Sequence, residues 1–364
     1  MILLNPGPVN LSDGVRRALA GPDLCHREPE FSDLQDTIRR GLLDVYGLAQ
    51  EHWAAVLLAG SGTAGVEAML ASLTPQKSTL LVIENGVYGE RMTRMASVHG
   101  IACVTVPHAW GAALDLKAVT QALERERAIT HVAVVHHETT TGRLNELAQL
   151  GEICRRSGAQ LLVDGVSSFG AEALDFEKWG IAACAGTANK CLHGAPGVSF
   201  VIALREALLS SSVAPRTLYL DLANACREQD KRGTAFTQPV HVMHALARAL
   251  EEFRDAGGWP ARHRLYAELA GAVREGLLKL RVEPLLPAQE TSVVLSAYRV
   301  PAALDYDALH DALKARGFII YAGQGRFKDN LFRISTMGAI TPADMERLLL
   351  AFRELMHPVD SPAH

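Results

Sequence analysis

Short runs of consecutive apolar residues alternate with stretches of helical periodicity through the first two thirds of the chain. Strand-length apolar runs occupy residues 54–59, 80–83, 101–106, 131–135, 160–163 and 198–203. Apolar runs without alternation are typical of strands that are buried on both faces of a mostly parallel sheet. Helical spacing is found at 34–46, 64–73, 116–127 and 144–157. The pattern predicts a repeated strand–helix unit and therefore an α/β fold with a mostly parallel sheet.

The pattern changes after residues 256–260. Helical spacing then covers 262–280, 306–316 and 342–355, while strand-like runs cover 292–298, 318–321 and 331–334, which predicts a smaller α+β domain. Near the start, Pro6 and Pro8 exclude a helix because proline fixes φ and lacks an N–H group. We expect an extended arm there, then a short helix at 11–20 and a polar loop at 25–31. The predicted division is an arm at 1–20, a large domain at 21–256 and a small domain at 257–364.

Composition narrows the class of protein. Apolar residues make up 48% and charged residues 21% of the 364 residues, which is ordinary for a soluble protein with a large core. The net charge is −4, so no basic excess favours nucleic acid or a membrane surface as a partner. The six cysteines form no Cys-x-x-Cys pair, and the N-terminal residues lack the features of a signal peptide. We therefore expect a cytoplasmic protein with reduced thiols.

Two histidine pairs invite a metal-site interpretation. His136 and His137 are adjacent, so they would point to opposite sides of an extended chain. His241 and His244 are three residues apart and could share a helix face. Neither pair has an obvious third ligand nearby in the sequence, and we predict no metal site.

The segment Gly60-Ser61-Gly62-Thr63-Ala64-Gly65 lies between an apolar run and a helical stretch. It fits the G-x-G-x-x-G pattern of dinucleotide-binding folds, and Glu84 follows 19 residues later, so a nicotinamide-dependent dehydrogenase is one hypothesis. A single phosphate held by backbone N–H groups and two hydroxyls at the helix start is a second hypothesis. A tight turn without any ligand is the third.

Asp164 and Lys190 are the other candidates for chemistry. Asp164 directly follows the strand-like run 160–163, where an open α/β sheet presents ligand groups. Lys190 lies in a run of small and apolar residues, and a desolvated lysine loses its proton more easily, as a Schiff-base nucleophile requires. A phosphate cradle, an acid for a protonated pyridine nitrogen and a lysine for an aldehyde are together the contacts that pyridoxal 5'-phosphate needs.

The sequence resembles the class V, fold-type I pyridoxal-phosphate aminotransferases, in particular the branch of 2-aminoethylphosphonate–pyruvate transaminases beside the alanine–glyoxylate aminotransferases. The matching segments run through nearly the whole chain: 5–8, 60–63 with 66–68, 85–92, 137–142, 164–170, 188–191, 236–239, 317–321 and 332–334. The resemblance implies a mostly parallel seven-stranded sheet and a homodimer with shared active sites. It differs at Gly165, where these enzymes usually have alanine, and at His137, where the phosphonate transaminases have cysteine.

The resemblance also implies roles for individual residues. Lys190 would hold the aldehyde of the cofactor and shuttle the proton, and Asp164 would pair with the pyridine nitrogen. The remaining cofactor contacts would come from Ser61, Gly62 and Thr63 at the phosphate, Thr237 at the phosphate of the neighbouring subunit, Tyr88 over the ring, Thr139 near the phenolic oxygen and Asn189 beside the lysine.

Two arginines would bind the substrate. Arg333 would bind its acidic group, because a planar guanidinium suits a carboxylate or a phosphonate. Arg27 is a candidate for the second cation that a phosphonate dianion would need.

The expected reaction is transfer of an amino group from 2-aminoethylphosphonate to pyruvate. An alanine or serine aminotransferase that uses glyoxylate or pyruvate is the alternative within the class. From other classes, the dehydrogenase hypothesis and a catalytically silent cofactor-binding or scaffolding protein stay open. A desulfurase would need a mobile nucleophilic cysteine, and none of the six stands in an obviously glycine-rich loop.

Overall fold

A seven-stranded sheet forms the centre of the protein. The computed structural model describes residues 1–209, 214–302 and 304–356. The strand order is β2 (Trp53–Ala59), β10 (Val198–Leu204), β9 (Ile181–Thr187), β8 (Gln160–Asp164), β5 (Ile129–Val135), β3 (Thr79–Glu84) and β4 (Ala102–Pro107). Only β10 runs antiparallel to its neighbours within this sheet, and the other pairs are parallel. The predicted mostly parallel seven-stranded sheet is confirmed.

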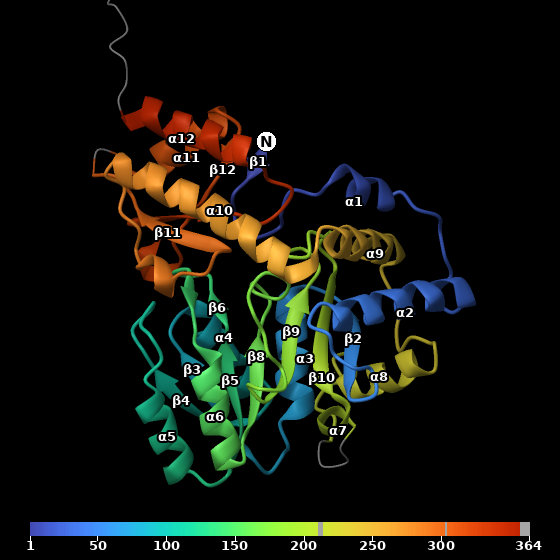
Figure 1. Cartoon of the computed structure of the whole chain (residues 1–364). Coiled ribbons are helices and arrows are strands. Elements are labelled where there is room, and N and C mark those ends of the chain that lie inside the picture. Colours follow the sequence, from blue (N-terminus) through green and yellow to red (C-terminus); the bar gives the residue numbers. More distant parts are fainter. Residues whose placement is uncertain (210–213, 303, 357–364) are drawn as a thin grey trace, which may run out of the picture.

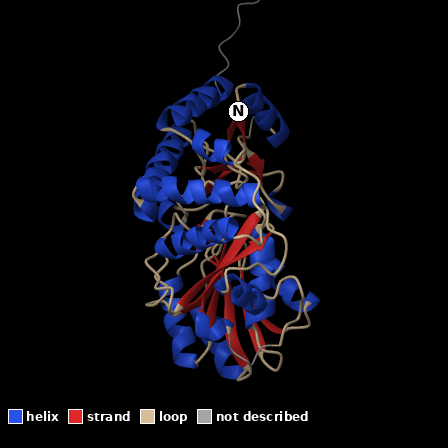
Figure 2. Cartoon of the chain, turned by 90° about the vertical axis from the view of Figure 1, so that its right-hand side faces the viewer, coloured by secondary structure: helices blue, strands red, loops and turns tan. Residues whose placement is uncertain are grey.

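Helices cover both faces of this sheet (Figures 1 and 2). Alternate residues of β2 show why: Trp53, Ala55 and Leu57 enter one apolar core, while Ala54, Val56 and Leu58 enter another. The first core also contains side chains of α2 (Pro29–Asp44), α5 (Leu116–Arg125), α6 (Leu147–Ser157) and α9 (Val240–Asp255). The second contains those of α3 (Gly62–Leu73), α4 (Val87–Val98), α7 (Arg205–Leu208) and α8 (Leu222–Asp230).

The C-terminal elements build a core of their own above the sheet, as Figure 1 shows. They comprise α10 (Gly258–Lys279), β11 (Leu295–Arg299), α11 (Tyr306–Ala315), β12 (Phe318–Ile319), β13 (Tyr321–Ala322), β14 (Leu331–Ser335) and α12 (Pro342–Met356). β14 lies between β11 and β13 in an antiparallel sheet. Within the described ranges no helix is both long enough and apolar enough to cross a membrane.

The N-terminal segment joins this C-terminal core. β1 (Ile2–Leu3) pairs in parallel with β12, and Leu4 is fully buried in the C-terminal core. The short helix α1 (Asp13–Ala18) follows and is capped by Ser12, whose hydroxyl accepts the N–H of Val15. The chain then crosses to α2 and the large sheet. The segment that contains Pro6 and Pro8 lies between β1 and α1 and is not helical, as expected, but it bends at Gly7, which has a φ of +109°.

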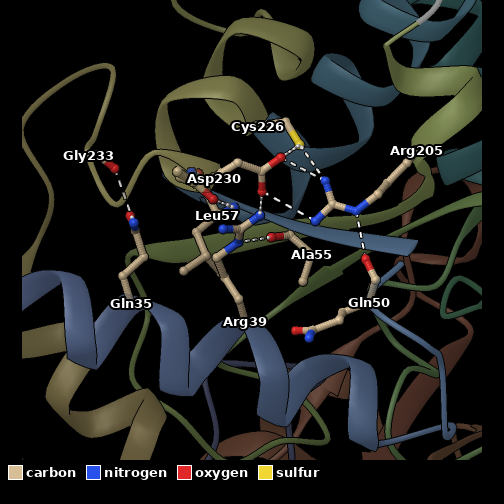
Figure 3. A network of polar contacts seen from close by, with 10 residues as sticks. Gln35, Arg39, Gln50, Ala55, Leu57, Arg205, Cys226, Asp230 and Gly233 are labelled. Carbon is tan, nitrogen blue, oxygen red and sulfur yellow. Dashed lines mark hydrogen bonds and ion pairs between the residues drawn. The ribbon is translucent and has the colours of Figure 1, made fainter. Parts of the chain in front are cut away.

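An ion-pair network ties α2 and α8 to the residue after β10 (Figure 3). Asp230 at the end of α8 accepts hydrogen bonds from Arg39 on α2 at 2.6 Å and from Arg205 at 2.7 Å. Arg39 also donates to the backbone of β2 at Ala55, and Arg205 donates to the carbonyl of Gln50. One carboxylate thus fixes two guanidinium groups that in turn hold the backbone around β2.

Several predicted boundaries are wrong for local reasons. α2 begins at Pro29, inside the segment expected as a polar loop, because proline suits the first turn of a helix. α6 begins at Leu147 rather than 144, because Arg143 and Leu144 form β7 and pair with β6 (His137–Glu138). The strand expected from 292 begins at Leu295, because the N–H groups of Ser292 and Val293 donate to Gly142 and Glu172 instead.

Candidate active site

The predicted site segments meet at one edge of the large sheet. β2 and β9 are both antiparallel to β10, so they run in the same direction as the parallel strands. The carboxyl ends of these strands therefore lie at one edge, where ligands bind in open α/β sheets. Each site residue follows a different strand: Ser61 after β2, Tyr88 after β3, Thr139 after β5, Asp164 at the end of β8 and Lys190 after β9.

Lys190 lies in the turn after β9, and the pKa of its side-chain amine is lowered. Its carbonyl accepts the N–H of His193 at 2.9 Å, which closes the turn. The side chain passes the N-terminal segment so closely that a Cβ on Gly7 would lie 2.8 Å from Cε and 3.1 Å from Nζ. Burial lowers the pKa of the Lys190 amine to about 8, and the charges of Arg333 and Arg91 act in the same direction. Nζ has no hydrogen-bond acceptor among the described residues, so it can act as a nucleophile.

Asp164 ends β8 as a buried carboxyl group. One of its oxygens accepts the N–H of Val166 at 3.0 Å. Burial raises the pKa of Asp164 to about 6, although this hydrogen bond and the charges of Arg91 and Lys190 act against that rise. A buried carboxylate of this kind gains from a cationic partner, and a protonated pyridine nitrogen is one.

The start of α3 provides an anion site. Ser61 is the N-cap residue, yet its side chain makes no capping bond, and the N–H groups of Gly62 and Thr63 precede the first possible intrahelical acceptor. A Cβ on Gly62 would lie 2.7 Å from Cγ1 of Val166, so glycine lets the helix start approach the loop that follows Asp164. The Thr63 hydroxyl accepts a hydrogen bond from Nη1 of Arg91 at 3.3 Å.

Tyr88 is held in the first turn of α4 by Glu138. One oxygen of Glu138 accepts the N–H groups of Tyr88 and Gly89 at 3.2 and 3.4 Å. The other oxygen accepts the N–H and the hydroxyl of Thr140 at 3.1 and 2.6 Å. Burial raises the pKa of Glu138 to about 7 in spite of these donors. The guanidinium of Arg91 lies 4.6 Å above the ring of Tyr88, which is a cation–π contact.

Arg333 on β14 connects the C-terminal sheet to this edge. It is 3% exposed, and its Nε donates to the carbonyl of Ala322 at 2.9 Å. Its Nη1 donates to the carbonyl of Thr139 at 3.0 Å and to Oε1 of Gln324 at 3.3 Å. All three acceptors are neutral, and no carboxylate within the described ranges lies within ion-pair distance of Arg333. A buried cation without a counter-ion favours an anionic ligand.

Of three further predicted site residues, Asn189 lies beside this cluster, whereas Arg27 and Thr237 lie apart from it. Asn189 is next to Lys190, and its side-chain oxygen accepts the hydroxyl of Thr187 at 2.9 Å. Arg27 is exposed in the turn that precedes α2, and it has no polar contact with Arg333. Thr237 is exposed in the segment before α9. Its predicted contact is with a neighbouring subunit, and that contact stays a prediction.

Sequence reasoning gave no role to three residues that lie in the site, namely Arg91, Glu138 and Gln324. Glu138 and Arg91 belong to matched segments of the resemblance, and a buried acid before a Thr-Thr-Thr-Gly turn was the available signal for Glu138. For Arg91 the signal was its position one helical turn after Tyr88. Gln324 carried no signal, because only the fold brings β13 and β14 to Thr139.

The histidine pairs have other partners. His136 contacts the hydroxyl of Ser168 at 3.0 Å, and His137 contacts the carbonyl of Ser167 at 3.1 Å. Burial lowers the pKa of both imidazoles to about 4, so both are neutral near pH 7. His241 and His244 share a face of α9 and approach Asp23 and the carbonyl of Pro22. In the part of the chain that the structure describes, no group of three or more potential ligands is arranged to hold a metal ion.

The arrangement fits pyridoxal 5'-phosphate. The hydroxyl of Thr139 is fully buried and has no partner among the residues that the structure describes, which leaves it free for the phenolic oxygen of a ring. The amine of Lys190 and the carboxyl group of Asp164 follow adjacent parallel strands, where they can meet opposite ends of that ring. The open start of α3 can accept the phosphate.

Comparisons with known proteins agree with this geometry. The family model described as aminotransferase class-V matches residues 23–344. A 2-aminoethylphosphonate–pyruvate transaminase of Vibrio cholerae serotype O1 is 36% identical over 361 residues, which are 98% of each chain. Another, of Syntrophobacter fumaroxidans, is 37% identical over 98% of this chain and 96% of its own. The solved structure of an alanine–glyoxylate aminotransferase from Nostoc sp. superimposes with a TM-score of 0.90 at 26% identity, covering 98% of this chain and 95% of that one.

The dehydrogenase hypothesis for Gly60 to Gly65 is wrong, because the family match assigns another chemistry to the same segment. The structure gives a packing reason for these glycines. Gly65 lies against β10, where a Cβ would be 3.3 Å from the Cβ of Ser199, and Gly62 packs against the loop after β8. The similarity to a dinucleotide fingerprint thus follows from close helix–sheet packing.

Proposed function

This chain belongs to the class V aminotransferases, which are pyridoxal 5'-phosphate-dependent enzymes, and we propose that it transfers the amino group of 2-aminoethylphosphonate to pyruvate. The products would be phosphonoacetaldehyde and alanine. The names of relatives that match almost the whole chain support this choice of donor and acceptor.

The buried, unpaired guanidinium of Arg333 is the observation that carries the proposal. Amino donor and keto acid bind in turn at the same place, and both carry an acidic group. Arg333 has only neutral partners in the described part of the chain, so an anionic group of either substrate would supply its missing counter-charge. The free N–H groups on Nη2 of Arg333 can donate to a phosphonate in one half of the reaction and to a carboxylate in the other.

Lys190 and Asp164 are proposed as the catalytic pair. When bound, the cofactor supplies an aldehyde that takes up the amino group and a ring that accepts electrons. The amine of Lys190, with a pKa of about 8, is substantially uncharged near pH 8, so it can take a proton from the donor carbon and return it. Asp164 would hold the proton on the ring nitrogen, because a buried carboxylate gains from a cationic partner.

The other predicted residues bind and orient the cofactor in this proposal. Ser61, Gly62 and Thr63 hold the phosphate at the start of α3. Tyr88 covers one face of the ring, and Thr139 donates to the phenolic oxygen. Asn189 positions the turn that carries the lysine through its bond to Thr187.

We also propose a cytoplasmic homodimer. Leu218 is 81% exposed and Tyr219 is 46% exposed, and the ring of Tyr219 packs against Phe236 at 4.9 Å. Apolar side chains exposed beside Thr237 support an interface at which Thr237 reaches the phosphate of a second subunit. Arg27 is proposed to approach a substrate only across such an interface. All six cysteines are free, which agrees with a reducing compartment.

An alanine or serine aminotransferase that uses glyoxylate or pyruvate is the second candidate. The similarity to the Nostoc structure supports it, and Arg333 would bind a carboxylate as readily as a phosphonate. The presence of His137, at a position where the phosphonate transaminases have cysteine, also leaves room for another donor.

An amino-donor screen of the purified holoenzyme tests the proposal. With pyruvate as acceptor, we expect turnover of 2-aminoethylphosphonate well above that of L-alanine or L-serine with glyoxylate. Loss of the visible absorbance on adding the donor alone reports the first half-reaction. A Lys190→Ala variant is the inactive control. Efficient turnover of alanine with none of 2-aminoethylphosphonate would refute the choice of donor and leave the aminotransferase class intact.

A further inference from the structure

Arg333 keeps one side of its guanidinium free. Its Nε and Nη1 are occupied by Ala322, Thr139 and Gln324. Its Nη2 has no acceptor among the described residues, although β14 and the surrounding loops bury the side chain. Two N–H groups on Nη2 are therefore available to a ligand.

The hydrogen bond to Arg333 fixes the orientation of the neighbouring amide of Gln324. A guanidinium only donates hydrogen bonds, so the atom of Gln324 that faces Nη1 at 3.3 Å must be the oxygen. The same oxygen lies 3.4 Å from the hydroxyl of Thr140. The amide nitrogen consequently points away from both groups, and it has no acceptor in the part of the chain that the structure describes.

The segment that carries Gln324 is clamped to the large domain by Trp110. Gly325 has a φ of +50°, and a Cβ there would lie 2.6 Å from the indole ring. The guanidinium of Arg326 lies 4.6 Å above the same ring, and the ring of Phe327 meets it edge-on at 5.7 Å. The indole N–H donates to Glu90 at 2.6 Å, on the helix that carries Tyr88. The segment that carries Gln324 is thus fixed against α4 of the large sheet.

We propose that Gln324 is a specificity-determining residue that selects a phosphonate over a carboxylate, an inference that rests on the proposed function. A carboxylate spreads its charge over two oxygens, and the free Nη2 of Arg333 can donate to it. A phosphonate has three oxygens, and the third needs another donor in the same small space. The amide N–H groups of Gln324 are such donors, because the oxygen of the same amide is bonded to Arg333 and the nitrogen has no acceptor among the described residues.

The test compares two inert ligands of matched shape. Ethylphosphonate and propionate lack an amine, so neither can react, and their inhibition constants can be measured against whichever amino donor the holoenzyme uses. The variants are Gln324→Leu, which removes the amide at similar volume, and Gln324→Glu. Gln121→Leu on α5, which is exposed and lies outside the site, is the control.

For Gln324→Leu we expect the inhibition constant of ethylphosphonate to rise by about tenfold or more, as for loss of a hydrogen bond to a charged group. The constant for propionate should change by less than about twofold, because Arg333 keeps its bonds to Ala322 and Thr139. Gln324→Glu should weaken the binding of both ligands, and that of the phosphonate dianion most. The new carboxylate would repel each anionic ligand and compete with it for Arg333. The control should leave both constants unchanged.

Two results would overturn the role of Gln324. One is equal weakening of both ligands, or of neither, in Gln324→Leu. The other is failure of ethylphosphonate to inhibit the wild-type enzyme. A holoenzyme that does not turn over 2-aminoethylphosphonate but shows the expected pattern of inhibition would refute the proposed donor and retain the phosphonate selectivity of the site. The two failures are therefore distinguishable.

Discussion

Replacing Glu138 by Gln is expected to remove part of the pH dependence of the free energy of unfolding. The carboxyl group is fully buried at the start of α4, and burial raises its pKa from 4.5 to about 7. A carboxyl group with a raised folded-state pKa contributes stability that is complete below about pH 4.5 and is lost as the pH rises through about 7. Glutamine resembles the protonated acid at every pH, so the variant lacks this loss.

The magnitude follows from the size of the shift. A rise from 4.5 to about 7 corresponds to roughly 3 kcal/mol between pH 4.5 and pH 8. For a chain of 364 residues, 1 kcal/mol moves the unfolding midpoint by roughly 1.3 °C. Between pH 5 and pH 8 the difference is roughly 2.5 kcal/mol, so the variant should gain about 3 °C relative to wild type over this range. Imperfect hydrogen bonds to Tyr88 and Thr140 add a cost to the variant that does not depend on pH.

The assay is thermal unfolding of both proteins at pH 5 and pH 8 with saturating cofactor. Subtracting one protein from the other removes contributions from groups that titrate in both. Glu146→Gln is the matched control, since Glu146 also caps a helix by accepting the N–H of Ala148 but is exposed to solvent. The reasoning would be refuted if the unfolding midpoint of Glu138→Gln relative to wild type were the same at pH 5 and pH 8, or were higher at pH 5 than at pH 8.

Lys190→Ala should bind the cofactor without a covalent link, so borohydride treatment followed by mass spectrometry should find label in the wild type and none in the variant. Arg333→Lys should raise KM for donor and acceptor by about tenfold to a hundredfold with an unchanged visible spectrum, because an ammonium cannot form the planar fork; an unchanged KM would contradict its substrate role. Although burial acts to raise the pKa of Asp230, hydrogen bonds from Arg205 and Arg39 hold it at about 2. Asp230→Asn should therefore cost about 1 kcal/mol at pH 7, reduced by solvent screening, and the deficit in urea midpoint should shrink as the pH falls from 4 to 2.

The large sheet could be predicted because its strands leave a strong signal. Strands buried on both faces appear as continuous apolar runs, and six of the seven strands were predicted within two residues at each end. The strand Ile181–Thr187 is not predicted, and only an apolar run at 181–185 is evident before Lys190, because alanine and glycine have low β propensity. The helices α4, α7, α8 and α9 were not predicted; α4 begins at Val87 directly after its N-cap Gly86, and a Gly-Val-Tyr-Gly segment is typical of a turn.

The C-terminal strands were harder to predict because pairing rather than composition determines them. The run 318–321 was expected as one strand, but it divides at Ile320, since β12 pairs with β1 and β13 pairs with β14. The same dependence on pairing explains which residues of the site could be predicted. Motifs after strands predicted Ser61, Asp164 and Lys190, whereas Gln324 and the clamp by Trp110 depend on how the C-terminal sheet meets the large one. No local pattern encodes such contacts.

The parallel pairing of Ile2 and Leu3 with Phe318 and Ile319 has a consequence for biosynthesis. During translation these residues emerge some 300 positions before their strand partner, so the arm must wait unpaired while the large sheet assembles. Gly7, which packs against Lys190, belongs to the same stretch. The amine of Lys190 is therefore enclosed only after the C-terminal residues have been made, so the proposed active site is completed late in chain assembly.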